Sequence, residues 1–363
     1  MIKGQKVEIG GKTAYQKWIE SQGIPIVRDF YIEDLRTLDL APWAWKGGRG
    51  AYLNLIGTGD ANDSYVAEIA PGKSLHPQRL LFEEMIYVLQ GNGSTSIWND
   101  ENRKISFEWQ EGSLFSPPVN TWRQHFNGSG SKPARFFVVT SAPPVINLFR
   151  NLDFVLNNSF SFDDRFDADP ESFSGKGESY PVKATQVWDT NFIADVRSIP
   201  LFERQNRGAG GSFLGIELAE NSMTAHISEF PVGTYKKGHR HGPGAHVVII
   251  GGTGYSLMWP EGEPIKQFRW HEGSVVVPPE RWFHQHFNTG KTPARYLALR
   301  WGSRKFPRPW TAKGYGTDES VKTGGDQIEY ADEDPQIRRL FEEELAKNGV
   351  ACRMDSVIKA EVL

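Results

Sequence analysis

Short apolar runs separated by turn residues dominate the hydrophobic pattern of the chain. Runs rich in Val, Ile and Phe, such as 85–89, 247–250 and 275–277, are bounded by Gly-x-Gly or Pro-Pro. Runs of this length between such boundaries are typical of β-strands. The Gly-Asn-Gly at 91–93 and the Gly-Thr-Gly at 252–254 predict hairpin turns that need positive φ. The pattern therefore predicts an all-β fold, a sandwich or a barrel.

The same pattern occurs twice along the chain. Residues 68–127 match residues 229–288 without a gap, at a constant offset of 161 positions that joins Asn127 to Asn288. The identical pairs include Gly72 with Gly233, Gly91 with Gly252, Gly93 with Gly254, Trp98 with Trp259, and Gln124-His125-Phe126-Asn127 with Gln285-His286-Phe287-Asn288. This period is too long for a solenoid, so the repeat predicts two copies of one domain.

The composition outside the repeat suggests how the two copies are joined. Residues 163–180 are rich in Asp, Ser, Gly and Phe, which is typical of a connecting segment. The predicted organisation is as follows: a first barrel with an N-terminal arm at 1–150, an inter-domain connection at 151–205, a second barrel at 206–310, and a tail at 311–363.

The tail contains one predicted helix, at about 335–348. Asp334 followed by a proline fits an N-cap and the first helical position, and Gly349 fits the stop. Leu340, Phe341 and Leu345 form its apolar stripe. We expect this helix to serve packing or an oligomer contact rather than chemistry.

Composition narrows the class of protein. Lys and Arg number 41 and Asp and Glu 44, a net charge of −3, which argues against a broad nucleic-acid-binding surface. The single cysteine, Cys352, excludes a disulfide framework and a thiolate metal cluster and fits a reducing compartment. The first 18 residues contain no apolar run that could act as a signal sequence, and nowhere do about 18 apolar residues occur together. We expect a soluble cytoplasmic protein without a membrane or nucleic-acid partner.

The two copies act as controls for each other, and they differ in possible metal ligands. The second copy has His239 and His241, which point to one face of a strand because the side-chain period is 2. His284 from another strand would complete a facial set of three imidazoles with open coordination positions. The first copy has other residues at the three matching positions, namely Gln78, Leu80 and Arg123. We therefore predict a metal site in the second barrel.

The first barrel is predicted to contain no metal. It has Glu84 where the second copy has Ala245. We predict that Arg123 and Glu84 face each other and that their ion pair fills the place of the metal.

Other residues near these positions are secondary candidates. A lone histidine in a strand is more often a core residue than a ligand, which applies to His76, His125, His226 and His271. His286 matches His125 of the copy without ligands, which favours a structural role, and period 2 turns His246 away from the metal. The residues kept as candidates for substrate contact or for support of the ligands are His226, His246, Trp282 and His286.

The motifs of the second copy resemble those of a known superfamily. The spacing Gly233-x5-His239-x-His241 and the spacing Gly273-x5-Pro279-x4-His284-x3-Asn288 resemble the two cupin motifs, and the whole chain resembles a bicupin. The resemblance implies two double-stranded β-helix (jelly-roll) barrels in tandem, with His239, His241 and His284 as metal ligands.

One departure from the common cupin pattern points to a subgroup. Many cupins have a glutamate as a fourth ligand, at the position of Ala245 here. A three-histidine set without this glutamate is similar to the metal motif of the gentisate 1,2-dioxygenase group, which implies Fe(II). Bicupins of that group generally hold the metal in the N-terminal barrel, whereas this chain has the motif in its C-terminal half.

These observations lead to one functional hypothesis and two alternatives. Three neutral imidazoles leave the full charge of a divalent ion, which favours an anionic, chelating small molecule. We expect a non-haem Fe(II) dioxygenase that acts with O2 on an aromatic hydroxy acid or an enolisable acid. The alternatives are a non-oxidative isomerase, decarboxylase or lyase that uses Mn, Zn or Ni, and a non-catalytic small-molecule-binding bicupin. The paired barrels, the N-terminal arm and the tail helix favour a homodimer or a larger homo-oligomer.

Overall fold

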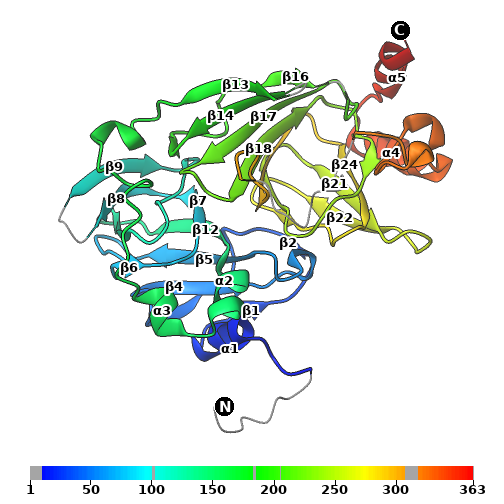
Figure 1. The fold of residues 1–363 in the computed structure, drawn as a ribbon. Helices are drawn as coiled ribbons and strands as arrows, with labels where there is room; N and C mark the ends of the chain where they lie inside the picture. Colours follow the sequence, from blue (N-terminus) through cyan, green and yellow to red (C-terminus); the bar gives the residue numbers. More distant parts are fainter. Residues whose placement is uncertain (1–9, 100–102, 183–184, 205, 307–317, 363) are drawn as a thin grey trace.

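A computed structural model describes residues 10–99, 103–182, 185–204, 206–306 and 318–362 (Figure 1). The described chain is built mainly of strands, which form four sheets that pair into two barrels. In Figure 1 the blue and cyan N-terminal barrel lies below the green and yellow C-terminal barrel. The predicted arm up to residue 9 and residues 311–317 of the predicted tail lie outside the described residues.

The N-terminal barrel consists of an eight-stranded sheet and a four-stranded sheet. The larger sheet has the order β1-β4-β5-β12-β7-β10-β15, with β3 paired to β4. Its strands are β1 (Ile26–Val27), β3 (Ala41–Trp43), β4 (Gly48–Leu53), β5 (Asp63–Ile69), β7 (Glu84–Gln90), β10 (Leu114–Phe115), β12 (Ala134–Thr140) and β15 (Phe192–Ile193). The smaller sheet has the order β6 (Gln78–Arg79), β11 (Trp122–Asn127), β8 (Asn92–Trp98) and β9 (Lys104–Gln110).

The C-terminal barrel consists of a nine-stranded sheet and a five-stranded sheet. The larger sheet has the order β13-β14-β17-β18-β25-β20-β23-β2, with β16 paired to β17. Its strands are β2 (Tyr31–Ile32), β13 (Glu178–Val182), β14 (Thr185–Thr190), β16 (Phe202–Arg204), β17 (Gly211–Leu218), β18 (Met223–Phe230), β20 (His246–Gly251), β23 (Val275–Val276) and β25 (Ala294–Trp301). The smaller sheet has the order β22 (Lys266–Trp270), β21 (Gly254–Trp259), β24 (Phe283–Asn288), β19 (Gly238–His239) and β26 (Gln327–Ile328).

The two barrels exchange short strands. Strand β2 from the N-terminal half pairs with β23, and β15 pairs with β10 in the same way. Buried apolar residues of both halves, such as Met85, Val139, Ile227 and Leu297, form one shared core between the larger sheets. The exchange and the shared core join the two barrels into one body.

The segment 151–205 differs from the sequence-based expectation of a simple connection. It contains β13 and β14 at the edge of the C-terminal sheet, together with β15 and β16. Residues 192–193 pair with the N-terminal barrel as residues 31–32 pair with the C-terminal barrel. Strand β15 has only two residues, which is too short to show a hydrophobic alternation, so the pattern does not indicate it.

Within the described ranges, five α-helices lie outside the sheets. Helices α1 (Ala14–Ser21), α2 (Ala142–Phe149) and α3 (Leu152–Leu156) belong to the N-terminal half, and α4 (Pro335–Asn348) and α5 (Met354–Val362) follow the C-terminal barrel (Figure 1). Asp334 caps α4, and Gly349, in the left-handed region, ends it.

The apolar side of α4 covers the C-terminal barrel. Phe341 and Leu345 are buried in one cluster with Tyr235 and Phe287 of that barrel. Packing is therefore one role of this helix, as the sequence indicated.

The turns follow the predicted glycine chemistry. Gly91 and Gly252 have φ values of 88° and 86°, in the region that favours glycine. At Gly93 and Gly254 the reason for glycine is a close approach instead. A Cβ there would lie 2.0 Å from the carbonyl oxygen of Phe126 and 1.9 Å from that of Phe287, respectively.

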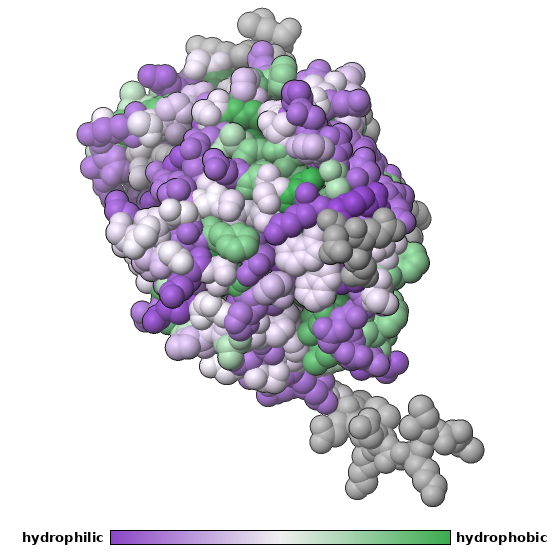
Figure 2. Space-filling view, turned by 90° about the vertical axis from the view of Figure 1, so that its left-hand side faces the viewer, coloured by the Kyte–Doolittle hydropathy of each residue, from purple (hydrophilic) through white to green (hydrophobic). Residues whose placement is uncertain are grey.

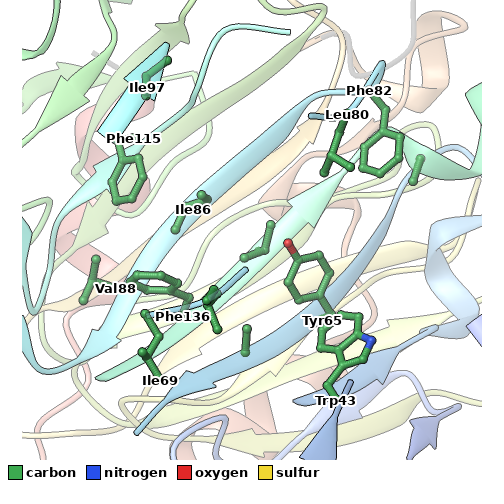
Figure 3. Close-up of a cluster of buried hydrophobic side chains, with 14 of the residues drawn as sticks. Trp43, Tyr65, Ile69, Leu80, Phe82, Ile86, Val88, Ile97, Phe115 and Phe136 are labelled. Carbon is green, nitrogen blue, oxygen red and sulfur yellow. The ribbon is translucent and has the colours of Figure 1, made fainter. Parts of the chain in front are cut away.

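The interior of the N-terminal barrel is filled with apolar side chains. Figure 3 shows Leu80, Ile86, Phe115 and Phe136 among the side chains between its sheets. Tyr65 lies in the same cluster, with its hydroxyl group as the polar end. The interior of this barrel is therefore a packed core.

The outer surface is mixed in polarity. On the face in Figure 2, apolar side chains form separate groups between hydrophilic ones. Among the described residues, no helix has both the length and the apolar character needed to cross a bilayer.

Candidate metal centre

Three histidines meet inside the C-terminal barrel. His239 on β19 and His284 on β24 are directly paired across an antiparallel ladder, and His241 follows β19 two residues later. The ring centroids of His239 and His284 are 4.3 Å apart, and those of His241 and His284 are 4.6 Å apart. One ring nitrogen from each residue lies within 4.8 Å of the others. The structure therefore brings together the three residues that the sequence selected.

Backbone carbonyl groups orient the three rings. The Nδ1 atom of His239 lies 3.1 Å from the carbonyl oxygen of Lys237, that of His241 2.7 Å from Gly242, and that of His284 3.3 Å from Trp282. A carbonyl oxygen only accepts hydrogen bonds, so each Nδ1 carries the proton. Each Nε2 atom then has a free lone pair, which is the form of imidazole that binds a metal.

Burial keeps these imidazoles uncharged. It lowers the pKa of His239 and of His284 well below the usual value, and it lowers the pKa of His241 to about 3. Neutral rings are good ligands, and three of them bring no negative charge. A divalent ion held here would keep its full charge toward a ligand.

The histidines line a cavity of about 730 Å³. Cationic side chains outnumber acidic ones in its wall. Among the described residues, the cations are Arg204, Arg207, Lys236, Arg300 and Arg304, and the acids are Asp318 and Glu319. This charge balance favours an anionic occupant.

The position of the missing fourth ligand faces the same cavity. Ala245 and Val247 line it, one on each side of His246 in the sequence. The methyl group of Ala245 occupies little space and offers no ligand atom, so this side of the cavity stays open.

The N-terminal barrel fills the corresponding place with charged groups. Arg123 on β11 pairs with Gln78 on β6 in the register that joins His284 to His239. Arg123 Nη2 lies 2.9 Å from Glu84 Oε2, so the predicted ion pair is confirmed. Lys46 Nζ lies 3.8 Å from Glu84 Oε1 and donates to Gln78 Oε1 at 2.8 Å. Only the pair of Arg123 and Glu84 was predicted. The structure adds Lys46 and also Tyr65, whose hydroxyl group donates to Glu84 Oε1 at 2.6 Å.

Electrostatics hold that cluster in its charged form. Burial alone would raise the pKa of Glu84, but Lys46, Arg123 and the Tyr65 hydroxyl together hold it at about 2. Burial lowers the pKa of Lys46 to about 8. Ring faces of Trp43, Trp45 and Tyr65 surround the ammonium group of this lysine.

Two of the secondary candidates lie on the cavity wall. His226 on β18 lines the cavity and stacks on Phe213, with ring centroids 5.0 Å apart. His286 also lines it, and its Nδ1 lies 2.7 Å from Ser256 Oγ, which accepts a hydrogen bond from Trp270.

The hydrogen bonds of His286 also occur in the barrel without the three histidines. His125 Nδ1 lies 2.8 Å from Thr95 Oγ1, which accepts from Trp109. A feature common to both barrels belongs to the scaffold, and this supports the structural role predicted for His286.

The other two candidates point elsewhere. His246 is fully buried, its Nδ1 lies 3.2 Å from the carbonyl oxygen of Gly244, and its ring lies near Phe137 of the N-terminal barrel. The side chain of Trp282 packs near Phe30, with ring centroids 5.4 Å apart. Neither side chain lines the cavity.

Several cavity residues were not predicted from the sequence, among them Lys236, Tyr296 and Arg207. Lys236 and Tyr296 both line the cavity, and Lys236 Nζ donates to Tyr296 Oη at 3.1 Å. Lys236 matches Leu75 at the constant offset, so the comparison of the two copies contained the signal. Arg207 precedes the matched segment 229–288, so the comparison of the two copies contains no signal for it.

Solved structures with a similar fold are bicupins. An oxalate decarboxylase, solved to study its substrate binding mode and reaction specificity switch, is 14% identical with a TM-score of 0.50; the match covers 76% of this chain and 77% of that chain. Oxalate decarboxylase from Bacillus subtilis at pH 4.6 is 14% identical, with a TM-score of 0.49 and 76% of each chain covered. Vicilin from hazelnut, Corylus avellana, is 12% identical, with a TM-score of 0.47, 75% of this chain and 85% of that chain covered.

The match with a TM-score of 0.50 agrees with the two-barrel fold of the structure. The chain consists of two cupin barrels in tandem, as predicted. A scan against models of protein families and a search of curated proteins each gave no match.

Proposed function

We propose that the C-terminal barrel is the centre of a metal-dependent enzyme that acts on a small, anionic, chelating organic acid. The observation that carries this proposal is the group of three neutral imidazoles in a cavity where cationic lining residues outnumber acidic ones. The N-terminal barrel, packed with apolar side chains and an ion cluster, is the structural partner.

His239, His241 and His284 would hold the metal, and their donor chemistry fits it. Imidazole suits Fe(II), Zn and Ni, and the set also permits Mn, so the ligands alone select no single ion. When bound, the divalent ion would act as a Lewis acid on the oxygen atoms of the substrate. The carbonyl groups of Lys237, Gly242 and Trp282 fix the ring orientations on which this depends.

The chain's own residues select the substrate by charge and by space. Arg204 and Arg207 share Asp318, with distances of 3.0 Å to its carboxylate oxygens. Arg304 Nη1 lies 3.6 Å from Glu217, and Lys236 adds a further buried cation. An anion in the cavity is attracted by this wall. Ala245 leaves room for it beside the histidines.

We favour a non-oxidative reaction, such as decarboxylation, isomerisation or elimination. The similar structure whose TM-score reaches 0.50 is named for the decarboxylation of a small acid. An Fe(II) dioxygenase is the second candidate, because three facial imidazoles leave positions for a bidentate substrate and for O2. The gentisate dioxygenase motif and the choice of iron stay predictions.

The test loads the protein separately with Fe(II), Mn, Zn and Ni under anaerobic conditions. Each form then receives a panel of dicarboxylates, 2-oxo acids and hydroxylated aromatic acids, with product formation followed by NMR and O2 uptake by an electrode. We expect turnover without O2 uptake with at least one metal. O2 uptake that tracks product supports the dioxygenase, and metal binding without any turnover supports a non-catalytic binding protein.

A matched variant links the activity to the centre. His241→Leu places in the C-terminal barrel the residue that the N-terminal barrel has at that position, Leu80. Turnover should disappear together with the metal. Turnover retained in this variant would contradict the proposal.

A further inference from the structure

Lys236 and Tyr296 form a polar cluster inside the C-terminal barrel. The ammonium group of Lys236 donates to Ser228 Oγ, and it donates to Tyr296 Oη at 3.1 Å. Lys236 is 4% exposed and Tyr296 is 7% exposed. Ring faces of Phe230 and Tyr296 lie 5.3 and 4.9 Å from the ammonium nitrogen. A buried ammonium group is thus held in place by neutral groups.

The cluster opens onto the cavity with the three histidines. Tyr296, Ala298 and Arg300 alternate along β25 and all line the cavity, while Leu297 and Leu299 face the shared core. Lys236 and Ser228 line the same cavity. A ligand at the histidines therefore shares its cavity with the ammonium and phenol groups.

The N-terminal barrel has apolar residues at the same three places. The pair Ser228 and Tyr296 on β18 and β25 corresponds to the pair Ala67 and Phe136 on β5 and β12.

Lys236 corresponds to a leucine in the N-terminal barrel. The backbone N–H of Lys236 donates to the carbonyl group of His286, and the N–H of Leu75 donates to that of His125. Leu75, Ala67 and Phe136 belong to the apolar core of their barrel. The fold therefore does not require the polar cluster.

The cluster is also unfavourable for stability in the absence of a ligand. A buried charge costs free energy unless an opposite charge compensates it. In the N-terminal barrel, Glu84 lies beside the buried Lys46 and Arg123, but the matching position in the C-terminal barrel is Ala245. The described hydrogen-bond partners of the Lys236 ammonium group are hydroxyl groups. The missing negative charge is what an anionic ligand would supply.

The charge states of the two side chains agree with this. Burial lowers the pKa of Lys236. Burial alone would raise the pKa of Tyr296, but the charge and hydrogen bond of Lys236 bring it below its usual value.

We propose that Lys236 and Tyr296 bind a second anionic group of the substrate, so that the substrate is a diacid. One carboxylate or hydroxy-acid end chelates at the histidines, and the other carboxylate accepts hydrogen bonds from Lys236 Nζ and Tyr296 Oη. An ammonium group has three N–H donors and the described hydroxyl groups accept two, which leaves one for the ligand. This inference rests on the proposed function, because it needs the metal at the histidines.

The test compares diacids with a monoacid on the zinc-loaded protein. Malonate, succinate and glutarate are titrated calorimetrically against acetate, and the metal content of each sample is measured first. We expect at least one diacid to bind wild-type protein at least tenfold more tightly than acetate. Lys236→Leu should weaken that diacid about tenfold to hundredfold, the range for hydrogen bonds to charged groups, and leave acetate unchanged.

The controls separate this inference from the proposed function. Lys291→Leu removes an exposed positive charge outside the cavity and should leave all affinities unchanged. Tyr296→Phe, which places the residue of the N-terminal barrel, should weaken the diacid about tenfold and serves as the second variant if Lys236→Leu does not fold. Without a ligand, Lys236→Leu should be at least as heat-stable as the wild type.

The results distinguish failure of this inference from failure of the proposed function. If zinc binds but no diacid binds more tightly than acetate, or if both variants keep the affinity for the diacid, the inference is overturned and the metal centre stands. If zinc itself does not bind, the proposed function fails.

Discussion

The two barrels have the same backbone pairing at their centres but carry different side chains there. Gln78 and Arg123 are paired in the N-terminal barrel as His239 and His284 are paired in the C-terminal barrel. Around the first pair, Glu84 and large apolar side chains fill the interior. Figure 3 shows the apolar side chains. Around the second pair there is a cavity of about 730 Å³.

This difference distinguishes side chains that stabilise the fold from side chains that could bind or convert a ligand. In the N-terminal barrel the buried charges compensate each other, so the cluster supports the fold. The C-terminal barrel keeps neutral histidines and the buried Lys236 around an open space, an arrangement that does not favour folding. Groups that the fold does not need, and that occur in one copy only, are the best candidates for function.

The largest expected effect is loss of the metal from His241→Leu. Structural zinc sites with four ligands bind with about 10–16 kcal/mol, so losing one ligand should cost on the order of 4 kcal/mol, about a thousandfold in affinity. Zinc affinity is measured by competition with a chromophoric chelator. The control is Gln78→His, which adds a single histidine to the N-terminal barrel and should not create a second site. Unchanged zinc affinity in His241→Leu would remove the basis of the comparison.

The next effect concerns the ion cluster of the N-terminal barrel. Glu84→Gln leaves Lys46 and Arg123 buried without a negative partner, which should lower the free energy of unfolding by about 3–5 kcal/mol. Urea denaturation measures this, and zinc stoichiometry should not change. The matched control replaces Lys46, Glu84 and Arg123 together by Met, Leu and Met. This triple variant should be more stable than Glu84→Gln, and the reverse order would show that the cluster is not a compensated unit.

Lowering the pH should reduce the stability that Glu84 contributes to the same cluster. The pKa of Glu84 is held at about 2, below its ordinary 4.5, so the unfolded chain takes up a proton there at higher pH than the folded chain. The stability that this group contributes is complete above about pH 4.5 and is lost as the pH falls toward 2, by at most about 1.4 kcal/mol per pH unit.

The pH test compares wild type with Glu84→Gln in urea unfolding between pH 7 and 3. The two stabilities should converge below pH 4.5, because the variant lacks this group. Buried neutral histidines such as His125, whose pKa burial lowers to about 3, affect both proteins equally from about pH 6.5 downward. Parallel curves would mean that Glu84 is not held in its charged form.

A smaller effect is expected from a glutamate placed in the C-terminal barrel at the position that matches Glu84. Ala245→Glu adds the negative charge that Glu84 supplies in the other copy. It should strengthen zinc retention and weaken malonate about tenfold, because like charges then share the cavity. Calorimetry checks this against Ala245→Gln, which adds similar volume without charge. Equal effects of Glu and Gln would indicate that volume alone decides what binds.

The smallest effect should be shared by both barrels. His125→Phe and His286→Phe each remove a hydrogen bond to Thr95 or Ser256, which should cost about 1–2 kcal/mol of stability in either barrel. Zinc affinity should be unchanged in both variants. A loss of zinc in His286→Phe alone would show that His286 supports the metal centre and is not only a structural residue.

The sequence was sufficient for features that rest on local chemistry or on the repeat. His239, His241 and His284 stood out because the other copy lacks them, and the pairing of Arg123 with Glu84 followed from the same comparison. The sequence did not predict strands of only two residues, or matches between the copies where the offset changes. Strands of two residues, such as 31–32 and 192–193, leave no hydrophobic period.

The Lys236 and Tyr296 cluster shows a second reason for failure. Tyr296 corresponds to Phe136 only after the offset changes by one, because the turn before β25 is one residue shorter than the turn before β12. Lys236 lay within the matched segment, but its partners come from other strands. Only the three-dimensional arrangement shows that the ammonium group faces the cavity.

The central claim is that one barrel binds a metal and the other has replaced it with an ion cluster. Anomalous diffraction at the zinc absorption edge, from crystals of the zinc-loaded protein, tests this directly. We expect one strong peak per chain, among His239, His241 and His284, and none beside Glu84 and Arg123. A peak in the N-terminal barrel, or no peak between the three histidines, would contradict the claim.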